Sequence, residues 1–276
     1  MFYHNNANIG SPGSGMAYPT LSSEYLADDM DDKQKTYIAI DMKSFYASTG
    51  RRTKVRGHYI FRRNAMCTRY ALEKDLPELK DITDAISCSQ LAQRFMETHA
   101  RPVITYGEVR PTDIVPVLAP NSKGLKTVFP MQWGFLAKDN KRTLFNARVE
   151  TAGEKPTFKE AWKSHRCIIP ASYYYEWQHF KSTDGKVKTG DKFAIQPAGY
   201  AVTWLCGLYR IEDGYPVFVV LTKEPTMELR RIHDRMPLML PEDKIDDWIN
   251  PSSNPEEVIP YALSDMIIEK ESLKEV

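Results

Sequence analysis

Residues 200–221 read YAVTWLCGLYRIEDGYPVFVVL, and this stretch decides the fold class. Tyr200–Tyr209 and Tyr215–Leu221 are apolar runs rich in Val, Tyr, Trp and Phe, which are the residue types that pack well on a pleated sheet. The segment Glu212-Asp213-Gly214 between them is a turn signal of hairpin length. The stretch therefore predicts two antiparallel strands joined by a tight turn.

Strand-like runs of similar composition recur elsewhere and are separated by turn signals. They are Val103–Tyr106, Ile114–Leu118, Val128–Trp133, Cys167–Pro170 and Lys192–Ile195. Residues 91–99 have helical spacing after Ser89, a possible N-cap, and helices are also expected at 156–164, 226–233 and 241–249. Because strands dominate without regular β-α alternation, the sequence predicts an α+β fold with a largely antiparallel sheet.

The composition of the chain excludes several classes of protein. Its 276 residues carry 37 Lys and Arg against 36 Asp and Glu, and 42% are hydrophobic, which excludes wholly disordered and fibrous proteins. The chain has no run of 18 apolar residues and no charged-then-apolar leader, so neither a membrane span nor secretion is expected. The net charge of +1 gives no support for nucleic-acid binding, so any such site needs a local basic groove.

The cysteine pattern argues against structural metal sites and disulfides. The four cysteines, Cys67, Cys88, Cys167 and Cys206, show no CxxC pair and no regular spacing. A zinc ribbon and a disulfide framework are therefore not expected, and neither is a metal or a cofactor. A reducing cytoplasm is the compartment that this pattern favours.

Residues 1–65 differ in composition from the rest of the chain and are expected to form a mostly disordered extension. Residues 1–36 are rich in Asn, Gly, Ser and Pro and include an acidic run, while 51–63 hold six Lys and Arg and no acid. Beyond the extension apolar runs become regular. A folded domain is therefore expected at 66–263, followed by a charged C-terminal tail at 264–276.

Four short motifs hold the candidate functional residues. They are Met66-Cys67-Thr68-Arg69-Tyr70, Asn146-Ala147-Arg148-Val149-Glu150-Thr151, Tyr174-Tyr175-Glu176-Trp177 and Ile232-His233-Asp234-Arg235-Met236-Pro237. Taken singly, each candidate has an ordinary structural explanation. An isolated cysteine is usually a small buried apolar residue, for example, and a Glu between aromatic residues usually faces solvent from a strand.

Taken together, the four motifs resemble the SOS response-associated peptidase family, whose members sense abasic sites in single-stranded DNA. Two further segments match the family pattern, Trp133-Gly134-Phe135 and Arg166–Ala171. The order and spacing of the motifs agree over about 200 residues, within about 67–263. One departure is Thr68, which stands where the family has Gly.

The resemblance implies a compact single domain around a curved, largely antiparallel sheet or barrel with flanking helices, and it implies a chemistry. Family members join an abasic site through an N-terminal cysteine, here Cys67, as a thiazolidine. Asn146 would hold the amine or ring, Glu176 would move protons, and His233 would protonate the sugar oxygen as the deoxyribose opens. Arg69, Arg148 and Arg235 would contact phosphates, and Trp133 and Pro111 would contact bases.

The same resemblance sets the expected partners and location. The partner would be single-stranded DNA containing abasic sites, bound by a monomer associated with the nucleoid in the cytoplasm. Replication-fork proteins are candidate recruiting partners.

The 66 residues ahead of Cys67 conflict with this chemistry, because the nitrogen of an internal cysteine is an amide and cannot form an imine. Three functions therefore stay open: a DNA–protein crosslinking enzyme acting after removal of 1–66, a cysteine autopeptidase that releases its own extension, and a non-catalytic single-stranded DNA-binding module.

Part of the extension, within residues 37–48, resembles the first palm strand of Y-family DNA polymerases. The match is Ile40–Ser48, in which Asp41 corresponds to a metal-binding carboxylate. It stops at Ser48, and two-metal chemistry needs further carboxylates, so polymerase activity is excluded. Either Arg62-Arg63 is encoded by a ribosome-binding sequence ahead of a start codon at Met66, or residues 1–66 are a propeptide cleaved at Met66-Cys67.

Overall fold

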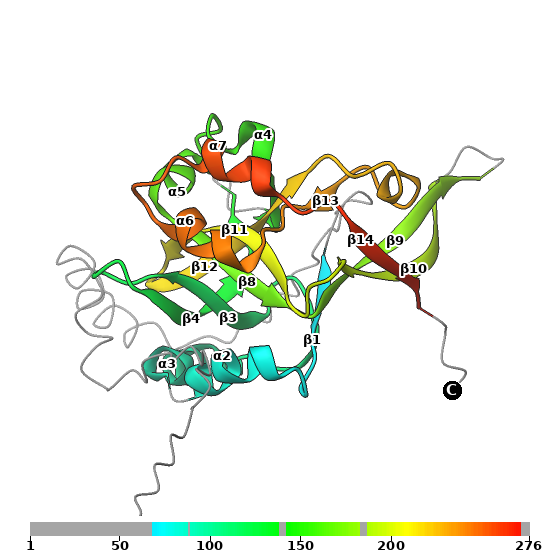
Figure 1. Ribbon diagram of the computed structural model, residues 1–276. Helices are drawn as coiled ribbons and strands as arrows, with labels where there is room; N and C mark the ends of the chain where they lie inside the picture. The colour runs from blue at the N-terminus through cyan, green and yellow to red at the C-terminus, as the bar shows by residue number, and fades with distance from the viewer. Residues whose placement is uncertain (1–67, 88, 138–141, 183–186, 272–276) are drawn as a thin grey trace, which may run out of the picture.

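The structure is a computed structural model that describes residues 68–87, 89–137, 142–182 and 187–271 (Figure 1). The expected disordered extension, its polymerase-like fragment, Cys67 and Cys88 lie outside the described residues.

The larger sheet is built from five long strands that close on themselves like a barrel. Its strands are β3 (Ile114–Pro120), β4 (Lys126–Trp133), β8 (Arg166–Ala171), β11 (Thr203–Glu212) and β12 (Tyr215–Lys223), extended by β7 (Asn146–Arg148) and β13 (Met236–Pro237). The order is β11-β8-β3-β4-β12-β13, and β11 also pairs with β12, which closes the ring. The β12–β4 and β12–β7 pairs are parallel and the others are antiparallel.

The smaller sheet contains five antiparallel strands in the order β14-β10-β9-β1-β2. Its strands are β1 (Arg69–Leu72), β2 (Gly107–Val109), β9 (Tyr173–Lys181), β10 (Val187–Pro197) and β14 (Met266–Lys270). The two sheets are joined in sequence at Ser172, where β8 ends and β9 begins. A β-bulge between Thr189 and Lys192 shifts the register of β10 against β9.

Short helices cover the larger sheet. They are α2 (Pro77–Ser87), α3 (Gln90–His99), α4 (Val149–Ala152), α5 (Lys159–Ser164), α6 (Ile245–Ile249) and α7 (Pro255–Val258), with 3-10 turns η1 (Leu229–Arg231), η2 (Glu242–Lys244) and η3 (Ile259–Tyr261). A two-stranded ribbon, β5 (Phe135–Leu136) with β6 (Thr143–Leu144), completes the elements. Helices α2 and α3 lie on one side of β3 and β4, and α4 to α7 gather on the other (Figure 1). Within the described ranges, no helix has the length and apolar character needed to cross a membrane.

The predicted α+β fold with antiparallel sheets is confirmed, and so is the hairpin on which it rests. Glu212 pairs with Tyr215 across the β11–β12 turn. Asp213 and Gly214 both have positive φ, 49° and 79°, as the tight hairpin turn that matches strand twist requires. The helix predicted at 91–99 is also present, and the Ser89 side chain accepts a hydrogen bond from Ala92 N as its N-cap.

Three expected elements differ in the structure. Val103–Tyr106 is not a strand, because β3 already pairs with β4 and β8 and only Val103 forms a bridge, to Ile114. The helix predicted at 226–233 is a single 3-10 turn, Leu229–Arg231. Part of the expected C-terminal tail is the strand β14, which pairs with β10.

A fully buried guanidinium fixes the start of β8 against two helix ends. Arg166 is 0% exposed. Its nitrogens donate to backbone carbonyls of Trp162 (2.8 Å) and Lys163 (2.7 Å) in α5. They also donate to the carbonyls of Trp248 (2.7 Å), Asn250 and Ser253 (2.9 Å) in and after α6. Helix C-termini carry unpaired carbonyls and partial negative charge, so a buried cation is satisfied there without a carboxylate.

Replacing this guanidinium should cost much of the stability of the domain. We expect Arg166→Met to lower the free energy of unfolding by about 3–5 kcal/mol, because buried carbonyls lose their donors. Denaturant unfolding measures this, with the exposed Arg230→Met as the matched control, expected to change stability by less than about 0.5 kcal/mol. Equal stability of the two variants would contradict a structural role for Arg166.

Candidate functional site

Strand β9 places Glu176 inside the protein. Alternate residues of the strand face opposite sides, and Tyr174 and Glu176 are 1% and 4% exposed. The Trp177 backbone N–H donates to Glu176 Oε1 at 3.3 Å. Arg69, the first residue of β1, lies opposite Tyr175. The strand that begins two residues after Cys67 therefore starts beside the buried carboxylate.

Strand β7 carries Asn146 and Arg148 along the edge of β12. Asn146 lies opposite Val220, and Arg148 lies opposite Thr222. Asn146 is partly buried, whereas Arg148 is exposed at the point where α4 begins. The Trp133 indole N–H donates to the Phe145 carbonyl at 2.9 Å, which fixes the backbone directly before Asn146.

Two residues predicted to contact bases, Trp133 and Pro111, pack within the protein. Trp133 is 1% exposed, and its ring stacks on Phe218 with 5.9 Å between the centroids. Pro111 is buried in the turn from Arg110 to Asp113, which is closed by the Asp113 backbone N–H donating to the Arg110 carbonyl at 3.0 Å. These contacts describe both residues in the protein without DNA, and their predicted base contacts stay predictions.

His233 is a buried residue two positions after the end of η1, and polar side chains contact its ring. It is 9% exposed, and its backbone N–H donates to the Leu229 carbonyl at 2.9 Å. Its Nδ1 lies 2.8 Å from Asp234 Oδ1, and the Arg235 backbone N–H points to the same nitrogen at 3.2 Å. A protonated Nδ1 donates to Asp234, whereas an unprotonated Nδ1 accepts from Arg235, so the two hydrogen bonds are alternatives. The His179 ring, from β9, packs edge-on at 5.4 Å.

Burial is the main reason why the pKa of His233 lies below its ordinary value of 6.5. The Asp234 carboxylate raises this pKa and the neighbouring His179 lowers it, and the net direction is downward. His233 is therefore mainly neutral at pH 7. His179 was not among the predicted site residues, and its place three residues after Glu176 is the only signal of it in the sequence.

Arg235 is held by a carboxylate from another motif. Its Nη1 and Nη2 donate to Glu150 Oε1 and Oε2 at 2.8 and 2.7 Å, and Nη2 also donates to the Thr222 carbonyl at 2.6 Å. The Arg235 side chain is 10% exposed. This bidentate pair joins the Asn146–Thr151 motif to the His233–Pro237 motif. The geometry favours a role in positioning the His233 loop over the predicted phosphate contact.

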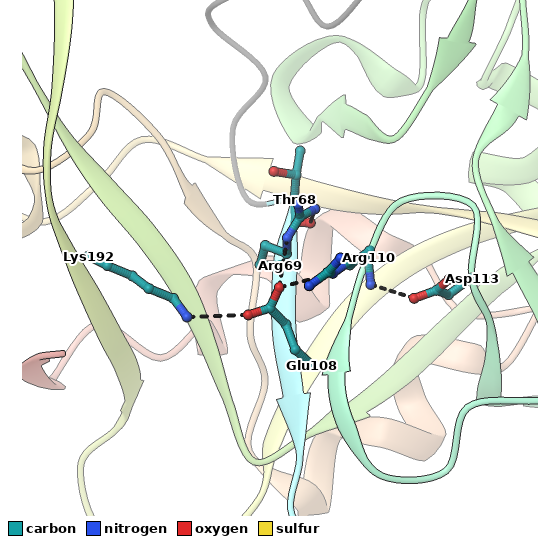
Figure 2. A network of polar contacts seen from close by, with 6 residues as sticks. All are labelled: Thr68, Arg69, Glu108, Arg110, Asp113 and Lys192. Carbon is teal, nitrogen blue, oxygen red and sulfur yellow. Dashed lines mark hydrogen bonds and ion pairs between the residues drawn. The ribbon is translucent and has the colours of Figure 1, made fainter. Parts of the chain in front are cut away.

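A cluster of charges lies at the start of β1 (Figure 2). Glu108 on β2 contacts the Arg69 and Arg110 guanidinium groups and the Lys192 ammonium group. The Lys192 Nζ also lies 3.3 Å from the centroid of the Tyr175 ring. Three cations and one carboxylate give a local excess of positive charge, which the net charge of the chain does not reveal. The sequence predicted Arg69 as a site residue but not Lys192 or Glu108.

Residues of the four motifs thus lie on, or contact, two strands, β9 and β12. β9 carries Glu176 and contacts Arg69 on one side and His233, through His179, on the other. β12 pairs with Asn146 and accepts a hydrogen bond from Arg235 through its Thr222 carbonyl. In the described parts of the chain, no group of three His, Cys, Asp or Glu side chains is arranged to hold a metal ion.

Comparison with known proteins identifies the family. Residues 66–274 match the family described as SOS response associated peptidase (SRAP). The chain belongs to the SRAP family. This confirms the resemblance read from the four motifs, and the match extends through β14 to residue 274.

SRAP relatives from bacteria align with most or part of the chain. The abasic site processing protein YoaM of Bacillus subtilis (strain 168) is 30% identical over 214 residues, which are 73% of this chain and 88% of YoaM. The abasic site processing protein YedK of Escherichia coli (strain K12) is 29% identical over 143 residues, 49% of this chain and 60% of YedK. A crystal structure of a protein from Bacteroides thetaiotaomicron has the same fold, with a TM-score of 0.56 at 21% identity, covering 74% of this chain and 91% of that one.

The contacts of His233 predict how its titration responds to its neighbours. We expect Asp234→Asn to lower the pKa of His233 further and His179→Gln to raise it, because the first change removes the carboxylate that raises this pKa and the second removes the ring that lowers it. Chemical shifts of the imidazole Cε1–H, followed by NMR against pH, measure both. Shifts in the same direction for the two variants would contradict this arrangement.

The same pKa has a consequence for stability. The unfolded imidazole, with a pKa near 6.5, binds protons more readily than the folded one. The contribution of His233 to stability is therefore fully present above pH 6.5 and is lost as the pH falls toward the folded pKa.

Proposed function

We propose that this SRAP chain captures abasic sites in single-stranded DNA as a covalent thiazolidine on Cys67, formed after residues 1–66 have been removed. The observation that carries this proposal is the position of Cys67. The family match begins at Met66, directly before it, and strand β1 begins at Arg69, two residues after it. The names of YoaM and YedK, abasic site processing proteins, support the class of substrate.

The chemistry depends on an amine and a thiol on adjacent carbons, which only an N-terminal cysteine offers. The neutral amine adds to the sugar aldehyde, and loss of one water gives an imine. The thiol then adds across the C=N bond, its proton passes to the nitrogen, and a five-membered ring closes. An α-amine has a pKa of roughly 8, against roughly 10.4 for lysine, so about a tenth of it is neutral and nucleophilic at pH 7.

The described residues supply the remaining roles in this proposal. Glu176, buried beside the start of β1, would carry protons between the amine and the departing water. His233 would give a proton to the sugar ring oxygen as the closed hemiacetal opens. Its lowered pKa makes the protonated form a minority at pH 7 but a stronger acid, so this step should become faster as the pH falls below 7. Asn146 would hold the amine or the ring through its amide.

Phosphate contacts would come from the exposed Arg148 and from the partly exposed Arg69. Both side chains lie on the strands that carry the proposed chemistry, β7 and β1. Each cation that neutralises a phosphate contributes to binding and makes binding weaken with salt. A local basic surface of this kind fits a protein whose net charge is +1.

A second function concerns the removal of residues 1–66. The name of the family contains the word peptidase, and hydrolysis of the Met66–Cys67 bond would release the Cys67 amine. The autopeptidase and crosslinking activities would therefore both use Cys67, and self-cleavage would come first. Removal of the extension in protein expressed without abasic DNA, and its retention in the Cys67→Ala variant, would favour self-cleavage.

The proposal predicts the N-terminus of the active protein. Intact mass should show loss of residues 1–66, and only that form should crosslink an abasic oligonucleotide. As a control, a chain that begins Gly-Cys67 keeps the thiol but turns the Cys67 nitrogen into an amide, and it should give no adduct. Crosslinking by full-length protein with an intact Met66–Cys67 bond would defeat the mechanism.

Replacing the thiol should separate the two steps of the reaction. In Cys67→Ser, the amine still forms an imine, but the hydroxyl closes a weaker ring that hydrolyses faster. We expect an adduct trapped by borohydride and little adduct that survives heating, as measured by denaturing gel electrophoresis. A heat-stable adduct in this variant would indicate another nucleophile.

A further inference from the structure

Glu108 holds three cations from three separate segments. Its Oε1 lies 3.0 Å from Arg69 Nε and 3.2 Å from Arg110 Nε, and its Oε2 lies 3.3 Å from Lys192 Nζ (Figure 2). One carboxylate balances one of these charges and leaves an excess of two. The side chains of Arg69, Lys192 and Glu108 are 28%, 25% and 30% exposed, so an anion from solvent can reach them.

Lys192 reaches Glu108 by crossing the face of the smaller sheet. The two residues lie on β10 and β2, and β9 and β1 lie between them. The Lys192 ammonium group lies 3.3 Å from the centroid of the Tyr175 ring and 5.6 Å from the centroid of the Trp177 ring. The ion pair with Glu108 therefore keeps a cation close to two aromatic rings of β9, those of Tyr175, which is 8% exposed, and Trp177, which is partly exposed.

A phosphodiester group resembles this carboxylate in the features that matter to the cations. Each carries one negative charge on two oxygens, and each suits guanidinium and ammonium donors at about 3 Å. Bases of single-stranded DNA stack on accessible aromatic rings, and Trp177 beside Lys192 is partly exposed. The Glu108 carboxylate thus binds the same three cations that could otherwise bind a phosphate.

We propose that Glu108 is an internal competitor of DNA phosphate, which limits the affinity of the protein for intact single strands. In the free protein it holds Arg69, Arg110 and Lys192 together. When DNA binds, a phosphate takes over these cations and must do so against the repulsion of the Glu108 carboxylate. Intact DNA then dissociates readily, and only strands captured covalently are retained.

The carboxylate stays charged over the neutral pH range, so the competition is always present. Burial by itself raises the pKa of Glu108, but the hydrogen bond and charge of Lys192, with the charges of Arg69 and Arg110, bring it below 4.5 overall.

The inference rests on the proposed function for its choice of DNA, but its test requires no abasic site. The probe is a labelled 15-nucleotide thymidine strand, bound to the full chain at several salt concentrations and followed by fluorescence anisotropy. We expect Glu108→Gln to bind it about three- to thirtyfold more tightly at low salt, because a repelling charge is lost. The slope of log affinity against log salt should steepen by about 0.7, as one more phosphate is neutralised.

The matched control is Asp191→Asn. Asp191 is the neighbour of Lys192 in β10 and pairs with Lys270 at 2.8 Å, so this variant makes the same change in net charge outside the Glu108 cluster. Its affinity should stay within about twofold of the wild type. Glu108→Asp, which keeps the charge, should behave like the wild type, and Glu108→Ala should shift affinity in the same direction as Glu108→Gln.

Unchanged or weaker binding by Glu108→Gln and Glu108→Ala would overturn the inference, since it would show that the carboxylate only organises the cations. An equal gain in Asp191→Asn would also overturn it in favour of a general charge effect. Crosslinking of an abasic strand by wild-type protein that has lost residues 1–66, measured in parallel, decides the proposed function separately.

Discussion

The Arg166 guanidinium is satisfied by five backbone carbonyls at the ends of α5 and α6, and the larger sheet depends on this arrangement. Arg166 is the first residue of β8, which lies between β3 and β11 in the closed ring of strands. α5 follows α4, and α4 begins directly after Arg148 on β7. Arg166 therefore fixes the start of β8 against α5 and α6, in the segment of the chain that follows β7 and the Asn146–Thr151 motif.

Contacts between motifs then place the functional groups. Trp133 donates from the core to the carbonyl before Asn146, Glu150 clamps Arg235, and His179 packs on His233. Each of these links joins segments that are separated by at least 12 residues in the sequence. Trp133 and Arg235 thus connect segments of the site motifs to one another.

Local patterns in the sequence predicted the elements that local forces determine. The 200–221 hairpin needs only two apolar runs and a turn that tolerates positive φ, and α3 needs only its spacing and the Ser89 cap. The motifs likewise pointed to Asn146, Glu176 and His233, whose burial or partial burial beside β9 and β12 agrees with a site. Their chemical roles remain predictions.

Long-range pairing could not be predicted in the same way. Val103–Tyr106 has strand composition but finds no free edge, whereas Met266–Lys270 lies in a charged segment and pairs with β10. An aromatic residue in a motif can serve the core or a ligand equally well, so the sequence did not reveal that Trp133 is buried. The contacts of Glu108 join residues up to 84 positions apart, and no spacing rule reveals them.

The position of Lys192 over β9 also gives the site an optical property. Of the five tryptophans in the chain, Trp133, Trp162, Trp204 and Trp248 are at most 8% exposed, while Trp177 is partly exposed with the Lys192 ammonium group 5.6 Å from its ring. Indole emission responds to a nearby charge and to solvent. Any ligand that moves Lys192 or covers Trp177 therefore alters the fluorescence of this indole, while the other four are shielded from solvent. Ligand binding can then be followed by intrinsic tryptophan fluorescence, without an added dye.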